Sequence, residues 1–374
     1  MSCKTVLHKH FVTNAIMASL YIFNKNNHHY GRKYEMNFFQ TNSFKVSALV
    51  AAVGLSFSVN AADFSNGYVF GDSLMDNGNI QAFSGDPSIP ERFTNGPNAA
   101  EIVAAGLGYP LTPSLHLIPG IPHGNNYSTA TATAVDTDGD ESTLDLNLPT
   151  QINSFLFEHG GEVSSDTLYS FSIGAQDILN AFTMRVAGVL AETKEERKAA
   201  VQAAKNSIKA AVDAEEAQIR KLIAAGAQHI LIVNAADQGV LPIIDIMTEQ
   251  TLALATTARQ EKRIKRLPKV ATRLSVKFNK LLAKRVAKIE RQTGIDIIEF
   301  DLFSSYANQI DNAEDFGYTN IDTPCIYTLN GLVINPECID FPVASGFLSW
   351  DEYHPTTLVH QNIGAEVLEL ILSH

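Results

Sequence analysis

Short apolar runs alternate along the chain with longer segments of helical character. Four runs, at residues 67–70, 168–173, 229–233 and 295–300, are rich in β-branched and aromatic side chains. This composition is typical of strands that are buried on both faces. Because helical segments separate the runs, the pattern predicts a parallel sheet built from βαβ units.

Three longer segments are predicted to be helical, and these are 193–225, 248–293 and 356–372. In the first, apolar residues recur at helical spacing, and Thr193 with Glu196 has the spacing of a capping box. Gly226 then provides a stop before the next strand. The second segment is basic and apolar and predicts one or two helices, with a break at Pro268.

Gly, Pro, Asn and Asp are concentrated in three further regions, 83–97, 111–149 and 308–350, which we expect to form loops. Long loops in a compact domain are usually functional. No internal repeat, linker or low-complexity tract interrupts residues 62–374. We therefore expect a single domain, a three-layer α/β/α sandwich around a central parallel sheet.

The first 61 residues do not fit this pattern. Residues 1–35 are rich in Lys, His and Asn, and we expect them to be a non-structural upstream extension. From Met36, a short basic region, an apolar run at 46–59 and small residues up to Ala61 have the organisation of a secretory signal peptide. A membrane anchor is the alternative, but about 20 apolar residues are normally needed to span a bilayer. We expect cleavage after Ala61 and a secreted or periplasmic protein.

The charge balance changes when this leader is removed. The chain of 374 residues has 28 Lys and Arg against 40 Asp and Glu, a formal net charge of −12. The leader holds 6 basic residues and 1 acidic residue, so residues 62–374 carry 22 and 39, or −17. A surface this negative disfavours nucleic acid and anionic lipid headgroups as partners. It is consistent with an exported enzyme without stable membrane insertion, and it leaves the oligomeric state open.

Cys325 and Cys338 are the two cysteines that follow the leader. A pair of cysteines in an exported chain predicts a disulfide, and a loop this short contributes roughly 3 kcal/mol in the entropic model. Two buried free thiols or a metal-binding pair are the alternatives, although His and Asp at ligand spacing are not found nearby. We therefore expect a disulfide and no metal site.

A serine follows the first predicted strand directly. The sequence GDSL at 71–74 places Ser73 at the carboxyl end of that strand, where open α/β sheets have their active sites. Gly-Asp-Ser also occurs by chance at such junctions, so the motif alone is weak evidence. Asp72 and Asp76 flank Ser73 closely and are expected to be turn or capping residues.

A candidate base for Ser73 lies near the other end of the chain. Serine needs a base to remove its proton, and the pKa of histidine suits that task near neutrality. His354 follows Asp351 by three residues, so that carboxylate can reach and orient its ring. An isolated Asp-x-x-His is more often a surface pair or a helix cap, but together with Ser73 it favours a Ser-His-Asp triad.

The two motifs together resemble the GDSL or SGNH hydrolases, which have a Gly-Asp-Ser-Leu block and a late Asp-x-x-His. The resemblance covers nearly all of residues 62–374, including 93–97, 126–127, 172–174, 234–242 and 350–357. Cys325 and Cys338 before the last block are similar to the secreted bacterial phospholipase and haemolysin branch. The resemblance implies an SGNH-type, flavodoxin-like sandwich and a serine esterase or lipase that needs no cofactor.

By this resemblance, Ser73 attacks an acyl ester, His354 acts as general base and then general acid, and Asp351 orients His354. The oxyanion would be held by the backbone N–H groups of Ser73 and Ala130 and by the side-chain amide of Gln176. Ala130, with Thr131 as the less favoured donor, stands where glycine is usual, and Gln176 replaces an asparagine. We expect reduced or altered activity, since one oxyanion donor changes the rate by about 10²- to 10³-fold.

The expected activity is that of a secreted esterase or lipase, preferably a phospholipase A or lysophospholipase, with lipid or other acyl esters as substrates. The same motifs also fit acyl transfer from a glycerophospholipid to a sterol, and deacetylation of carbohydrates. A non-catalytic interaction protein whose oxyanion site has drifted is a further alternative. Apolar residues of the late loop favour acyl chains, and these are Phe341, Phe347, Leu348 and Trp350.

Overall fold

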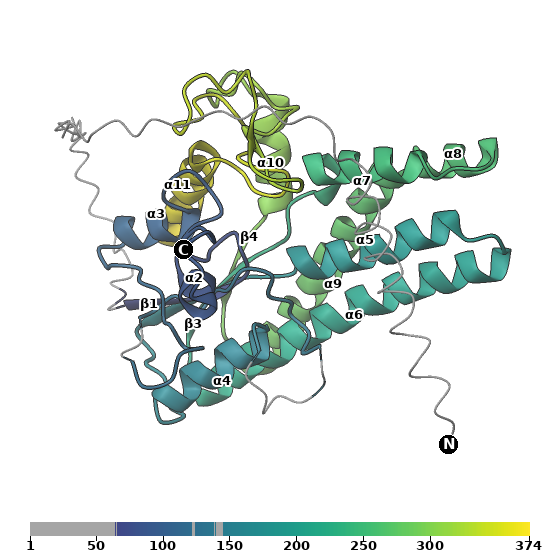
Figure 1. Ribbon diagram of the computed structural model, residues 1–374. Helices are drawn as coiled ribbons and strands as arrows, with labels where there is room; N and C mark the ends of the chain where they lie inside the picture. The colour runs from purple at the N-terminus through teal and green to yellow at the C-terminus, as the bar shows by residue number, and fades with distance from the viewer. Residues whose placement is uncertain (1–63, 65, 122–123, 138, 140–144) are drawn as a thin grey trace. The chain divides into compact units, whose positions relative to one another are not determined.

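The computed structural model describes residues 64, 66–121, 124–137, 139 and 145–374. The described residues belong to one compact unit (Figure 1). The predicted upstream extension and signal peptide, residues 1–61, lie outside the described residues.

A four-stranded parallel sheet forms the centre of the protein, as the apolar runs predict. Its strands are β1 (Asn66–Gly71), β2 (Thr167–Ser172), β3 (His229–Val233) and β4 (Ile297–Phe300). They lie in chain order, β1-β2-β3-β4, and each pairs with the next in parallel. The carboxyl ends of all four strands therefore lie at the same end of the sheet.

Helices cover both faces of this sheet (Figure 1). They are α2 (Asn79–Ser84), α3 (Ala99–Gly106), α4 (Leu148–Glu158), α5 (Ala175–Leu190), α6 (Lys194–Ala225), the 3₁₀ turn η1 (Gln238–Val240), α7 (Pro242–Leu252), α8 (Ala258–Ile264), α9 (Leu267–Thr293), α10 (Leu302–Asp311) and α11 (Thr357–Ser373). Among the described residues, none of these helices combines the length and apolar character needed to cross a lipid bilayer.

Side chains alternate between the two faces of the strands and so form two separate cores. Phe70, Phe171 and Ile232 pack with α4, α5, α6 and α9. Val69 and Leu231 point to the other face and pack with α3, α10 and α11. The fold is therefore the predicted three-layer α/β/α sandwich with a central parallel sheet.

The helix boundaries follow the sequence signals in most places. α6 begins with the Thr193–Glu196 capping box and ends at Gly226, whose φ of 120° suits glycine. Pro268 lies in the first turn of α9, where a backbone N–H would have no acceptor within the helix, so the N–H that proline lacks is not missed. The loop predicted at 308–350 begins too early, because α10 continues to Asp311.

The late Gly- and Pro-rich region contains a small antiparallel hairpin, β5 (Ile326–Tyr327) and β6 (Val333–Ile334). Cys325 and Cys338 flank it and form a disulfide, and both cysteines are buried. The predicted disulfide is thus present, and the alternatives of free thiols or a metal-binding pair are excluded.

One carboxylic acid, Glu215 of α6, is fully buried. Neither of its carboxyl oxygens has a hydrogen-bond partner among the described residues. Burial raises the pKa of Glu215 well above the ordinary value of 4.5, and the charge of Asp177 adds to this shift. Burial therefore favours the neutral form of Glu215, and its ionisation destabilises the fold.

Replacing Glu215 with Gln is expected to raise the melting temperature at about pH 8 and to change it little at about pH 4. A carboxyl whose pKa is raised by folding binds its proton more tightly in the folded state. Wild-type stability therefore falls as the pH rises from 4.5 towards the folded pKa, and the Gln variant escapes this loss. Thermal unfolding across this pH range measures the difference.

Glu216→Gln is the matched control for this experiment. Glu216 forms ion pairs with Arg285 and Lys288 at 3.0 Å, so its neutralisation is expected to lower the melting temperature at neutral pH. An equal gain for Glu215→Gln at both ends of the pH range would contradict the titration argument.

Candidate active site

Ser73 lies in the tight turn that follows β1, at the carboxyl end of the sheet. The preceding Gly71 packs so closely on β2 that a Cβ atom there would collide with the carbonyl oxygen of Ser172. Gln151 of α4 accepts the Gly71 N–H at 2.9 Å and donates to its carbonyl oxygen at 2.8 Å. These contacts fix the end of β1 before the chain turns to Ser73.

The turn after Ser73 is held by the buried carboxylate of Asp76. This carboxylate accepts the N–H groups of Gly78, Asn79 and Ile80, at the start of α2, at 2.9, 2.8 and 3.2 Å. It also accepts the N–H of Ala130 at 2.8 Å. Asp76 is therefore a capping residue, as expected, and it joins the turn to a segment more than 50 residues away.

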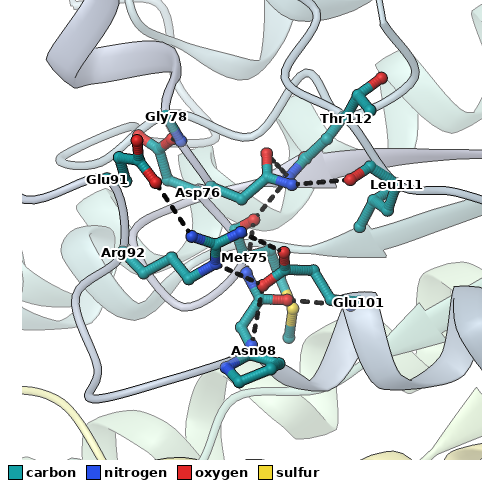
Figure 2. Close-up of polar contacts among 12 residues, drawn as sticks. Met75, Asp76, Gly78, Glu91, Arg92, Asn98, Glu101, Leu111 and Thr112 are labelled. Carbon is teal, nitrogen blue, oxygen red and sulfur yellow. Dashed lines mark hydrogen bonds and ion pairs between the residues drawn. The ribbon is translucent and has the colours of Figure 1, made fainter. Parts of the chain in front are cut away.

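A second set of contacts supports the turn from α3 (Figure 2). Arg92 forms a bidentate ion pair with Glu101, at 2.6 and 2.8 Å. Glu101 accepts the backbone N–H of Asn98 at 3.0 Å, within the capping box of α3. The side-chain amide of Asn98 donates to the carbonyl oxygen of Met75 at 3.0 Å. Because Met75 is two residues from Ser73, the position of the turn depends on α3.

His354 and Asp351 lie in the loop that leads to α11, and this loop contacts the turn that carries Ser73. Nε2 of His354 is 2.8 Å from Oγ of Ser73, and Nδ1 is 2.8 Å from Oδ2 of Asp351. Asp351 also accepts the backbone N–H groups of Tyr353 and His354, each at 2.8 Å. The structure thus brings the three residues of the two sequence motifs into contact, although Ser73 and His354 are 281 positions apart in the sequence.

Glu352, next to Asp351, has a structural role that the sequence motifs do not reveal. Its buried carboxylate accepts the N–H and the hydroxyl of Thr328 at 2.7 and 2.8 Å, and the N–H of Leu329 at 3.1 Å. Its carbonyl oxygen accepts the N–H of Ile243, in α7, at 2.9 Å. Glu352 therefore joins the disulfide-closed hairpin and α7 to the loop of His354.

Ala130, the expected oxyanion donor, is not favoured by the structure. Ala130 is buried, and its N–H is directed at the Asp76 carboxylate. The next residue, Thr131, is exposed and has a φ of 68°, and both residues line the cavity beside Ser73. Among the described residues we find no acceptor for the Thr131 N–H. Ala130 is therefore poorly placed to donate to an oxyanion, because the Asp76 carboxylate already accepts its N–H.

Gln176 lies at the start of α5, just after β2, and lines the same cavity. Its side-chain amide donates to Oδ1 of Asn180 at 3.1 Å. This contact uses one of the two N–H groups of the amide and leaves the other one for an acceptor in the cavity. The sequence therefore identified a residue at the site, but not the direction of its side chain.

Two buried carboxyls lie next to these residues in the sequence. Burial raises the pKa of Asp72 to about 6, and the N–H of Leu74 and the charge of His354 offset part of this effect. Burial also raises the pKa of Asp177 to about 7, although its carboxylate accepts the N–H of Ala134 at 2.8 Å. Both acids brace the loops around the site through backbone N–H groups.

A cavity of about 790 Å³ lies beside Ser73 and His354. Its wall is mainly aliphatic and aromatic, and includes Leu74, Val103, Leu231, Leu302 and Ile363. His360 of α11 is one of the polar residues in this wall, and its Nδ1 accepts the N–H of Ala99 at 3.2 Å. Burial, with a smaller effect of His354, lowers the pKa of His360 to about 3, so its ring is neutral. Within the described part of the chain, no cluster of His, Cys, Asp and Glu is arranged to hold a metal ion.

Comparison with known proteins identifies the class of this site. The profile of the GDSL-like Lipase/Acylhydrolase family matches residues 68–367. The chain therefore belongs to this family and is an ester-bond hydrolase.

Individual relatives come from plants and bacteria. The chain is 22% identical over 329 residues to a GDSL esterase/lipase of Arabidopsis thaliana, covering 77% of this chain and 82% of that protein. It is 26% identical over 206 residues to Lipase 1 of Photorhabdus luminescens, covering 54% and 27%. A solved extracellular lipase of Streptomyces rimosus aligns with 82% of this chain and 98% of its own, at 17% identity and a TM-score of 0.37. These relatives do not single out the bacterial phospholipase and haemolysin branch.

Replacing Asp76 with Ala is expected to lower thermal stability and esterase activity together. The substitution leaves four backbone N–H groups without their acceptor, at a cost on the order of 3 kcal/mol. Asp76→Asn keeps one acceptor oxygen and is expected to lie between the wild type and the Ala variant. Thermal unfolding and ester hydrolysis test both effects. An unchanged melting temperature for Asp76→Ala would show that the turn does not depend on this carboxylate.

Proposed function

We propose that the protein is an exported carboxylic-ester hydrolase in which Ser73, His354 and Asp351 form a catalytic triad. The observation that carries this proposal is the continuous hydrogen-bonded path from Asp351 through His354 to Ser73, with 2.8 Å at each step. Membership of the GDSL-like lipase and acylhydrolase family supports ester hydrolysis as the reaction.

The reaction would proceed through an acyl-enzyme. Nδ1–H of His354 donates to Asp351, which leaves Nε2 as the base that takes the proton of Ser73. Oγ of Ser73 attacks the ester carbonyl, and His354 then gives the proton to the departing alcohol. A water molecule that loses its proton to the same nitrogen releases the carboxylic acid and restores Ser73.

We assign the oxyanion to the backbone N–H groups of Ser73 and Thr131 and to the side-chain amide of Gln176. The positive φ of Thr131, and the lack of an acceptor for its N–H among the described residues, support its assignment in place of Ala130. Gln176 would contribute through the amide N–H that does not bind Asn180. The contact with Asn180 orients the amide, and a preorganised donor stabilises the transition state more than a mobile one does.

We propose acyl esters of lipids as the substrates, with phospholipase A or lysophospholipase activity. The largely apolar cavity beside Ser73 supports an aliphatic acyl group, and an acetyl group would leave most of it unfilled. Among the described residues, seven of the thirteen exposed large apolar side chains lie at 329–343, around the disulfide-closed hairpin. Leu332 of this set also lines the cavity, so the apolar surface continues into the site.

The proposed secretion rests on the sequence of the leader and on the resemblance of the cysteine pair to the secreted bacterial branch. Detection of the mature chain in periplasmic or culture fractions, beginning at Ala62, tests it. A protein that stays in the cytoplasm with residues 36–61 intact would contradict it.

Ser73→Ala is expected to abolish hydrolysis of p-nitrophenyl esters and of lysophosphatidylcholine, with a loss of at least about 10³-fold in kcat. Ser88→Ala is the control, because Ser88 lines the same cavity but does not contact His354. Long-chain esters are expected to react faster than acetates. A folded wild-type protein that is inert on every ester and unlabelled by a fluorophosphonate would instead be a non-catalytic member of the family.

Gln176→Ala is expected to lower kcat by about 10- to 10³-fold with little change in KM, because an oxyanion donor acts in the transition state. Asn180→Ala removes the acceptor that orients the Gln176 amide and is expected to lower kcat less than Gln176→Ala does. Steady-state kinetics of both variants separates the two effects. Equal losses of kcat in both would show that the amide serves only the start of α5.

A further inference from the structure

The positive charges of the protein are concentrated in one part of the fold. Residues 190–210 and 256–281, which we call the cationic arm, contain 14 Lys and Arg against four Glu, a formal net charge of +10. The rest of residues 62–374 contains 8 and 35, or −27. The arm comprises the first half of α6, all of α8 and the first half of α9. The overall charge of −17 therefore hides two regions of opposite sign.

The two segments of the arm are neighbours in space. α6 and α9 lie in parallel, because contacts join residues 72 positions apart, such as Arg220 to Gln292 at 2.7 Å. The same offset places Lys205 beside Lys277, whose Nζ donates to the Lys205 carbonyl oxygen at 3.3 Å. Gln260 of α8 donates to the carbonyl oxygen of Leu190 at 3.3 Å. Figure 1 shows the turn between α5 and α6, together with α8, extending away from the sheet.

Charge pairing changes along the surface between α6 and α9. Beyond the arm, Asp213 and Glu216 of α6 pair with Arg285 and Lys288 of α9 at 2.7 to 3.0 Å. These ion pairs hold the second halves of the two helices together, and Asp213 also pairs with Lys209 at the end of the arm.

Within the arm, by contrast, cations lie near cations. Partial desolvation and the charge of Lys205 lower the pKa of Lys277, and desolvation with Arg197 and Arg259 lowers that of Arg263. The arm contains four acidic residues, too few to balance its 14 cations. They are Glu192, Glu195, Glu196 and Glu261. Neighbouring like charges destabilise the fold, and an anionic partner that binds among them relieves this repulsion.

Exposed apolar side chains accompany the cations. Met184 on α5 is 36% exposed and Leu254, just after α7, is 56% exposed. Leu179 of α5 and Leu241, just before α7, line the cavity beside Ser73, so both helices lead from the cavity towards the arm. Cations combined with exposed apolar groups are typical of proteins that adsorb to anionic lipid bilayers.

We propose that the cationic arm docks the protein on an anionic phospholipid surface, with headgroup phosphates bound among the Lys and Arg side chains of α6, α8 and α9. The net negative charge of the protein disfavours such a partner only when it is averaged over the whole surface, because the arm itself is positively charged. The adsorption does not require Ser73 to be catalytic. A failure of the triad assignment therefore leaves this proposal intact.

The test is sedimentation of the full chain carrying Ser73→Ala with vesicles of phosphatidylcholine alone or mixed with phosphatidylglycerol. Binding is expected only with phosphatidylglycerol and is expected to weaken as salt is added. Lys205→Glu with Lys269→Glu is expected to weaken binding by at least about tenfold, because each cation near such a surface contributes about fivefold. Both side chains are exposed, so the fold is expected to persist.

Lys284→Glu with Arg291→Glu is the matched control, because it makes the same charge change at exposed positions of α9 outside the arm. This control is expected to keep most of the binding. Equal loss in both variants, or equal binding to the two kinds of vesicle, would overturn the proposal. If the protein instead self-associates in a salt-sensitive way, and the arm variant abolishes this association, then the partner of the arm is the acidic surface of a second copy. Displacement from vesicles by a DNA duplex at lower concentration would assign it to nucleic acid.

Discussion

The buried carboxylate of Asp76 connects two segments whose relative position determines the geometry of the site. It accepts N–H groups at the start of α2 and the N–H of Ala130, so the turn of Ser73 and the segment before Thr131 are held together. The Ala130 N–H is used in this way, whereas the Thr131 N–H has no acceptor among the described residues. Burying a carboxylate opposes folding, and these charge-assisted hydrogen bonds offset that cost. One structural acid thereby decides which backbone donor an oxyanion would meet.

The two cores of the sandwich have different tasks. The core formed with α3, α10 and α11 contains the cavity, and Val103, Leu302 and Ile363 serve both as core residues and as its wall. The long helices α6 and α9 pack in the opposite core, where Glu215 of α6 is fully buried. Changes that enlarge the substrate cavity therefore affect stability directly, whereas changes at the ends of the long helices affect mainly the surface.

The sequence predicted the parts of the fold and the site that depend on local pattern. Four strands, the α6 capping box, the disulfide and the selection of Ser73, Asp351 and His354 follow from residue type and order. The use of the Ala130 N–H did not follow, because its acceptor is a carboxylate 54 residues away in the sequence. The role of Glu352 also depends on tertiary contacts, since its partners lie in the hairpin and α7. The net charge was the least informative sequence property for predicting partners, because it does not show where on the surface the charges lie.

The segregation of charge makes the folded protein a strong electric dipole, with its positive pole on the ends of α6, α8 and α9. A charged boundary exerts a torque on such a molecule as well as a force. At physiological ionic strength the field of that boundary decays over about 8 Å, so the torque acts only in the last stage of approach. In dilute buffer the same field extends about three times further or more, and the molecule turns before it arrives. The orientation of first contact is therefore a property of the solvent as much as of the protein.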